Sequence, residues 1–204
     1  MGELVAFVIL VAVVAWSVAY MRAQKPVSSP QNLIQQHRYT EAVVAAERIL
    51  STSPDDSAAW LHRGEALKLL GRFDDAVASY HRSSDPAARE GIALSLAHMG
   101  HDLDEARAIM EETIALHPQI QEFQALGLAY ILLRSGDREA ALRTYRDNVE
   151  LLETRFRDDY TDPDPLLAET LVMFAKLAEA NGDAQAAELL RLRAARWAPG
   201  SVWA

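Results

Sequence analysis

The sequence contains no cysteine. This absence excludes a disulfide framework, a thiolate-ligated zinc site, an iron–sulfur cluster and a cysteine nucleophile. A basic surface is also missing, because 29 acidic residues outnumber 20 lysines and arginines and give a formal net charge of −9. General nucleic-acid-binding proteins need a positively charged footprint, so we expect no nucleic acid among the partners.

Charge is absent from a long stretch near the start of the chain. Residues 4–21 form an uninterrupted apolar run of eighteen residues. As a helix rising about 1.5 Å per residue, this run just spans a hydrocarbon core of about 30 Å. Trp16 and Tyr20 lie near one end, where amphipathic rings favour the lipid headgroups. We therefore predict a single-pass transmembrane anchor over residues 1–21.

The flanking charges predict the orientation of this anchor. Arg22 and Lys25 follow the apolar run, and no basic side chain precedes it. Positive flanks face the cytoplasm, which predicts an inner-membrane protein with a cytoplasmic body. A cleaved signal peptide is the alternative, because Ser17-Val18-Ala19 has the small residues of a cleavage site. In that case the body would lie outside the cytoplasm.

The rest of the chain divides into a short linker and a helical domain. Residues 22–30 contain two prolines and two serines and predict an extended linker. From residue 31 to residue 204, apolar side chains recur with helical spacing, and no stretch alternates as a half-buried strand would. Turns centred on glycine, such as Gly71, Gly100 and Gly182, separate the helical stretches. We therefore expect an all-α domain over residues 31–204.

One unit of this domain has a recognisable pattern. The unit runs from Ser57 to about Ala88, and its marker positions are Trp60, Gly64, Ala76 and Tyr80. This pattern resembles the tetratricopeptide repeat. Leu67 and Arg63 depart from it, since the family usually has tyrosine and leucine there. Small residues at positions 64 and 76 would let two antiparallel helices approach closely.

Weaker copies of the pattern extend the resemblance to about residues 31–199. The resemblance implies a tetratricopeptide-type α-solenoid of about four to five helix pairs, the first one truncated, preceded by one transmembrane helix. Such an array has a concave surface, lined by the first helix of each pair, that binds a peptide or a partner helix. By pattern position, the candidate partner-binding residues are Leu61, Glu65, Lys68, Gln121, Gln124, Leu128, Val172, Lys176 and Glu179.

Three other features have functional interpretations. His98 and His101, followed by Asp102, could bind zinc, but the spacing supplies no third ligand. The aspartates of residues 158–165 could bind calcium, although a solvated loop is the better interpretation. After the last helix, we expect Trp197 and Trp203 to pack on the last helices, with a partner contact as the alternative. We therefore predict no metal and no cofactor.

The sequence contains no nucleophile elbow, phosphate-binding loop, dinucleotide fingerprint or zinc-protease motif, so we expect no enzyme and no small-molecule substrate. The predicted function is that of a membrane-tethered adaptor or scaffold, which recruits or stabilises a protein partner in a membrane complex. The alternative is an extracytoplasmic assembly factor or chaperone of the envelope. Alanine- and arginine-rich usage is typical of a bacterial protein from a GC-rich genome.

Overall fold

The computed structural model describes residues 28–116, 121–158 and 164–204, with side chains omitted at 121–123 and 151–158. The predicted anchor at residues 4–21 and most of the predicted linker lie outside these ranges. Within them, no helix is both long and apolar enough to cross a bilayer.

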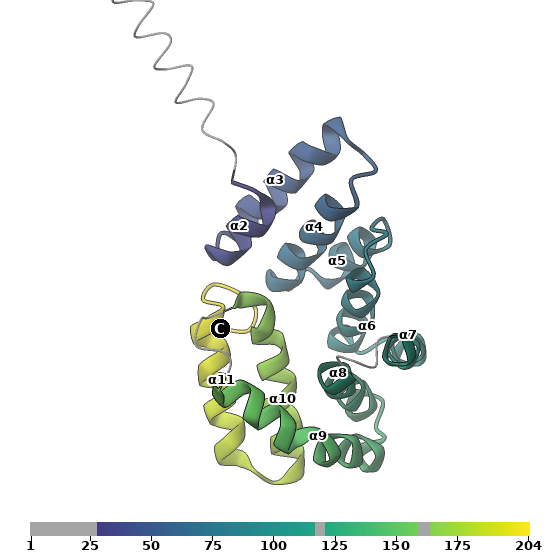
Figure 1. Cartoon of the computed structure of the whole chain (residues 1–204), viewed down its shortest axis with the longest axis vertical. Helices are drawn as coiled ribbons and strands as arrows, with labels where there is room; N and C mark the ends of the chain where they lie inside the picture. Colours follow the sequence, from purple (N-terminus) through teal and green to yellow (C-terminus); the bar gives the residue numbers. More distant parts are fainter. Residues whose placement is uncertain (1–27, 117–120, 159–163) are drawn as a thin grey trace, which may run out of the picture.

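The described residues form α-helices, one 3₁₀ turn and no strand. The helices are arranged in consecutive antiparallel pairs (Figure 1). This arrangement confirms the predicted all-α helical-repeat solenoid. The elements are α2 (Pro30–Gln35), α3 (Tyr39–Thr52), α4 (Ser57–Leu69), α5 (Phe73–Tyr80), α6 (Ala87–Met99), α7 (Leu103–Leu116), α8 (Gln121–Arg134), α9 (Arg138–Asp158), η2 (Pro165–Leu167), α10 (Ala168–Asn181) and α11 (Ala184–Trp197).

Helix ends follow local sequence signals. Ser29 caps α2, which begins at Pro30, the last residue of the predicted linker. The Asp183 carboxylate accepts a hydrogen bond from the backbone of Ala186 at the start of α11. Gly182, just before it, ends α10 with a φ of +97°. A side chain at this position would be strained, so the Gly-Asp pair both ends one helix and starts the next.

The close approach of helices in the unit that best matches the repeat pattern depends on one tyrosine. A Cβ atom added to Gly64 would lie 2.5 Å from Cε1 of Tyr80, and one added to Gly91 would lie 2.6 Å from Cζ of the same ring. The ring of Tyr80, only 2% exposed, therefore fills the space between α4 and α6. Because glycine has no side chain, positions 64 and 91 leave room for the Tyr80 ring to pack against both α4 and α6.

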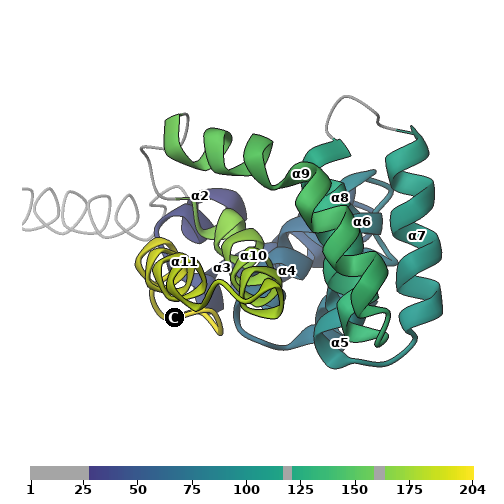
Figure 2. The same ribbon diagram turned by 90° about the horizontal axis from the view of Figure 1, so that it is seen from below.

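The array curls back on itself. Helix α10 packs against α8, and η2 contacts α4 (Figures 1 and 2). The Gln35 amide donates to Asp164 Oδ1 at 3.3 Å, so α2 meets the residue that caps η2, just before the last pair. The last pair therefore covers part of the concave side of the preceding pairs.

Candidate functional site

A chain of polar side chains crosses the concave side from one inner helix to the next. Lys68 of α4 donates to Glu169 Oε2 of α10. Glu169 Oε1 lies 2.9 Å from Nε2 of His98 on α6. Nδ1 of His98 lies 3.2 Å from the hydroxyl of Tyr130 on α8, and Lys176 donates to that hydroxyl at 3.1 Å. An ammonium only donates, so the Tyr130 hydroxyl accepts from Lys176, and we assign its own hydrogen bond as donated to Nδ1 of His98. The ring proton of His98 then lies on Nε2 and is donated to Glu169.

The surroundings of these polar side chains favour a charged Lys68, a charged Glu169 and a neutral His98. Burial alone would raise the pKa of Glu169, but the Lys68 ammonium and the hydrogen bond from His98 outweigh it and bring that pKa to about 2. Burial likewise opposes the charge of Lys68, and Glu169 reverses the effect and raises the pKa of Lys68 above its usual range. Burial lowers the pKa of His98, which favours the neutral imidazole. The buried ion pair and the neutral histidine thus connect four helices.

The end of the described chain covers this network. The Trp203 ring lies 4.6 Å from the His98 ring and 5.9 Å from the Phe73 ring, measured between centroids. The Val202 amide donates to the Leu69 carbonyl at 2.8 Å. Trp203 packs on Phe73 of α5 and His98 of α6 and also lines a cavity beside α10 and α11, so the expected packing on the last helices describes only part of its surroundings. Helical periodicity cannot reveal which distant unit a segment reaches.

The structure divides the predicted partner-binding residues into two groups. Those of the first complete unit face the last pair: Lys68 is ion-paired, Leu61 is buried, and Glu65 Oε2 is 2.7 Å from His62 Nδ1. Of the others, Gln124 is buried, Leu128 and Val172 pack partly against the core, Lys176 donates to Tyr130, and Glu179 is ion-paired with Arg191. The side chain of Gln121 lies outside the described residues. Partner binding at these positions stays a prediction.

The last pair carries an open hollow. A cavity of about 490 Å³ lies between α10, α11 and residues 202–204, and we call it the terminal hollow. Its side chains include Val172 and Lys176, which were predicted to bind a partner, together with Arg191, Leu192 and Val202. Leu192 is 60% exposed and Val202 is 48% exposed. The hollow therefore combines apolar surface with two cations, Lys176 and Arg191, and one carboxylate, Glu188.

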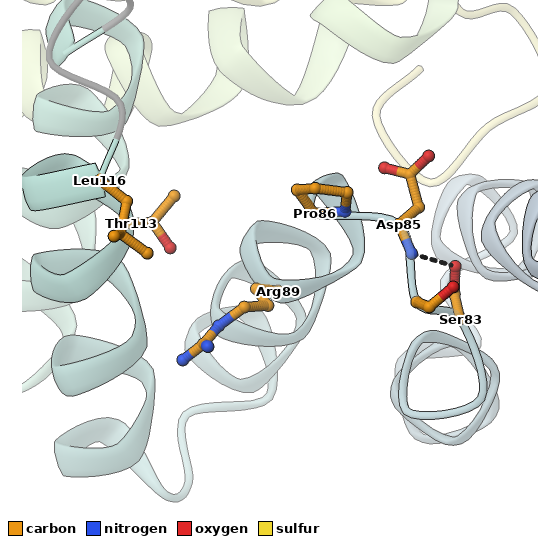
Figure 3. Close-up of a pocket in the computed structure, with 7 residues that line it drawn as sticks. Ser83, Asp85, Pro86, Arg89, Thr113 and Leu116 are labelled. Atoms are coloured by element: carbon orange, nitrogen blue, oxygen red, sulfur yellow. Dashed lines mark hydrogen bonds between the residues drawn. The ribbon is translucent and has the colours of Figure 1, made fainter.

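A second hollow lies between the start of α6 and the end of α7, and the sequence patterns did not predict it. This cavity of about 430 Å³ includes Arg89, Thr113 and Leu116 (Figure 3). At one edge of it, the Ser83 hydroxyl accepts a hydrogen bond from the backbone N–H of Asp85 at 3.2 Å. Leu116 is 61% exposed, and this exposure is a property of the structure that the sequence patterns do not contain.

The two histidines of the zinc hypothesis have separate surroundings. His98 belongs to the buried chain, whereas His101 lies on the surface 2.8 Å from Asp102. Across the ranges that the structure describes, no three potential ligands gather as a metal site would require. Most of the acidic loop of the calcium hypothesis, residues 159–163, lies outside those ranges.

Comparisons with known proteins agree with the repeat architecture. The tetratricopeptide repeat family matches residues 33–94. The fold is similar to a MamA crystal structure (TM-score 0.52, 14% identity, 82% of this chain and 87% of that chain). It is also similar to the tetratricopeptide-like repeats of a Podosopora anserina putative kinesin light chain (0.54, 16%, 82% and 90%). No sequence match to a curated protein was found. At these identities the structures show the fold alone, and together with the family match they support a protein of tetratricopeptide-repeat type.

Proposed function

We propose that this protein is a membrane-tethered scaffold that holds a protein partner beside the membrane. A tetratricopeptide-type solenoid supports a role in protein–protein interaction. The observation that carries the proposal is the terminal hollow, where predicted partner-binding residues line exposed apolar surface. The proposed role needs no catalysis, and the sequence contains none of the catalytic motifs considered above.

The terminal hollow suits a segment of another protein. Leu192 and Val202 offer apolar contact area that is costly to leave in water. Lys176 and Arg191 stand beside it and outnumber the one carboxylate there, Glu188, so they favour an acidic or hydrogen-bond-accepting edge on the partner. An amphipathic helix with an apolar face and an acidic margin fits this combination.

Capture from membranes tests the scaffold function. The full-length protein and a variant beginning at Val27 are used to capture partners from membranes in mild detergent, and the proteins retained are identified by mass spectrometry. Partners retained by both forms make the repeat domain the binding surface and residues 1–26 a tether. If neither form retains a specific partner, a stable scaffold is ruled out.

A pair of surface variants locates the contact. Leu192→Asp puts a charge into the terminal hollow, whereas Leu116→Asp puts the same charge on an equally exposed leucine of the other hollow. We expect only the first to abolish capture. Loss of capture in Leu116→Asp alone would transfer the binding surface to the hollow between α6 and α7.

The proposed location is the inner membrane, with residues 4–21 as the span and the repeat domain in the cytoplasm. Positive flanks at Arg22 and Lys25 support this orientation. The alternative is an envelope assembly factor whose domain lies outside the cytoplasm. Protease added to intact spheroplasts should leave the domain uncut, and the isolated protein should keep its original N-terminus. Digestion from outside would establish the alternative.

A further inference from the structure

Two consecutive residues that follow the last helix lie against the end of α4 and the helices after it. The Val202 amide donates to the Leu69 carbonyl at 2.8 Å. The Trp203 ring lies 4.6 Å from the His98 ring and 5.9 Å from the Phe73 ring, measured between centroids. We call the surface that these two residues cover the tryptophan site, and it is formed by Leu69, Gly71, Phe73 and His98.

Each part of the tryptophan site suits one feature of a short peptide. Leu69 is the last residue of α4, and carbonyls in the last turn of a helix have no partner within it, so a backbone N–H can bind there. A Cβ atom added to Gly71 would lie 3.2 Å from Cγ2 of Val202, so the absence of a side chain lets a branched residue pack closely. The Phe73 and His98 rings stack 5.3 Å apart and offer an aromatic surface to a third ring.

The chain's own segment, residues 201–204, occupies this site with a weak hold. One hydrogen bond, from Val202 to Leu69, joins the segment to α4, whereas the amides of residues 201, 203 and 204 donate within residues 198–204. The side chain of Val202 is 48% exposed. Nε1 of Trp203 is buried and finds no acceptor in the part of the chain that the structure describes. Burying a donor without an acceptor opposes the packing of the ring, so a competing segment with the same contacts can replace this one.

We propose that residues 201–204 occupy a binding site for a partner, and that a partner segment with a branched apolar residue followed by tryptophan displaces them. The Val202–Trp203 pair carries the proposal, because it shows the chemistry that the site accepts. The partner's amide would donate to Leu69, and its indole would stack on the two aromatic rings. Since a partner segment is not tied to the end of α11, its indole can turn the N–H toward water or toward an acceptor of its own.

This inference deepens the proposed function and rests on it for the source of the segment, a partner protein. Val202 and Trp203 also line the terminal hollow, so a partner helix bound in the hollow lies directly beside the segment. Such a helix is in position to replace the segment with an aromatic residue of its own. A synthetic peptide tests the site without any cellular partner, so failure to capture a membrane partner and failure of peptide binding are separate results.

Peptide binding to the full-length protein in detergent micelles, followed by fluorescence anisotropy, is the test. The probe is fluorescein-labelled Gly-Ser-Val-Trp-Ala, and its control peptide carries alanine in place of tryptophan. In the wild type the segment competes with the probe, whereas in Trp203→Ala the place of the ring is open. We expect the probe to bind Trp203→Ala at least about tenfold more tightly than it binds the wild type, and at least about tenfold more tightly than the control peptide does. Equal affinities in either comparison would overturn the proposal.

A second variant keeps the ring and weakens the hold of the segment. Val202→Pro removes the N–H that donates to Leu69, so we expect the probe to bind this variant more tightly than the wild type as well. Trp60→Ala is the control, because its ring lies elsewhere beside Arg82, and it should bind the probe no better than the wild type. A gain in Trp60→Ala equal to that in Trp203→Ala would mean general loosening of the domain and would overturn the proposal.

NMR of the histidine rings locates the bound peptide. Trp203→Ala removes the indole that lies 4.6 Å from the His98 ring, so the ring-proton signals of His98 should shift. Addition of the probe should return these signals toward their wild-type positions, whereas the signals of His101, on the surface beside Asp102, should not respond. Binding that leaves the His98 signals unchanged would put the probe elsewhere and overturn the assignment. Thermal melting verifies that each variant is folded.

Discussion

Lys68 and Glu169 are 101 residues apart in the sequence, and their side chains form an ion pair inside the fold. The side chain of Lys68 is 11% exposed and that of Glu169 is 4% exposed. The pair connects α4 of the first complete unit to α10 of the last. It explains why a position predicted to meet a partner is occupied within the chain itself.

Breaking this pair should be costly. Lys68→Met leaves Glu169 buried without its main counter-charge, and removal of one partner of a buried pair typically costs about 3–5 kcal/mol. We expect the free energy of unfolding, measured by urea denaturation, to fall by this order. Arg107→Gln breaks an exposed pair with Glu111 and is the control, for which we expect a much smaller loss. Similar losses in both variants would show that the buried pair adds no special stability.

Acidification should weaken the fold through His98. Burial lowers its pKa below the ordinary value of 6.5, so the folded state favours the neutral ring. Stability from this group is present above pH 6.5 and is lost as the pH falls toward the lowered pKa, by up to about 1.4 kcal/mol per pH unit. His98→Gln should therefore lose less stability than the wild type between pH 7 and pH 5. His101→Gln, on the surface, should follow the wild-type curve, and a flat wild-type curve would contradict the prediction.

Glu169 should control stability at lower pH. Its folded pKa of about 2 lies below the ordinary glutamate value of 4.5, so its contribution is present above pH 4.5 and is lost as the pH falls toward 2. Glu169→Gln should remove most of this dependence as well as lower stability at neutral pH. Urea denaturation at pH 5, 4 and 3 measures the difference. An unchanged dependence in the variant would assign acid sensitivity to other carboxylates.

The ring of Tyr80 should make Gly91 intolerant of a methyl group. Gly91→Ala places a Cβ atom 2.6 Å from the ring, and overpacking of this kind typically costs about 1–3 kcal/mol. In a Tyr80→Leu background the same change should cost less, because the smaller side chain leaves room. A double-mutant cycle on the free energy of unfolding gives the coupling. Additive effects would mean that the ring moves aside freely.

Trp203 should shield His98 from water. In Trp203→Ala the His98 ring loses the aromatic face that covers it at 4.6 Å, so its pKa should rise toward 6.5. NMR titration of the imidazole protons measures this shift. Trp60→Ala, whose ring lies elsewhere beside Arg82, should leave the His98 pKa unchanged. A shift in both variants would indicate general loosening of the domain.

The sequence predicted the local parts of this structure better than the distant ones. Glycine and aspartate at positions 182 and 183 indicated a helix boundary, and the structure confirms it. The repeat spacing predicted Lys68 and Gln124 to lie on the inner face of the array, and in the structure Lys68 is ion-paired with Glu169 and Gln124 is buried. That spacing follows from helical geometry within one unit. It contains no information about which residue of a distant unit contacts a given inner-face residue.

The contacts that close the array escaped prediction for this reason. Glu169 was not singled out, because a glutamate near the start of a helix is common on solvated surfaces. Trp203 follows the last helix, and its contact with His98 depends on how far the whole array curls. That curl is the sum of small rotations between successive pairs, which no local pattern records.

The curled array has a consequence for how the chain folds. In an open solenoid each repeat contacts only its neighbours, so folding can begin anywhere and spread. Here the Lys68–Glu169 and Leu69–Val202 contacts join distant segments, which raises the mean sequence separation of contacts and slows folding. During synthesis, Lys68 leaves the ribosome 101 residues before its carboxylate partner. Until the last pair has been made, Lys68 in the early helix pairs therefore lacks its ion-pair partner Glu169.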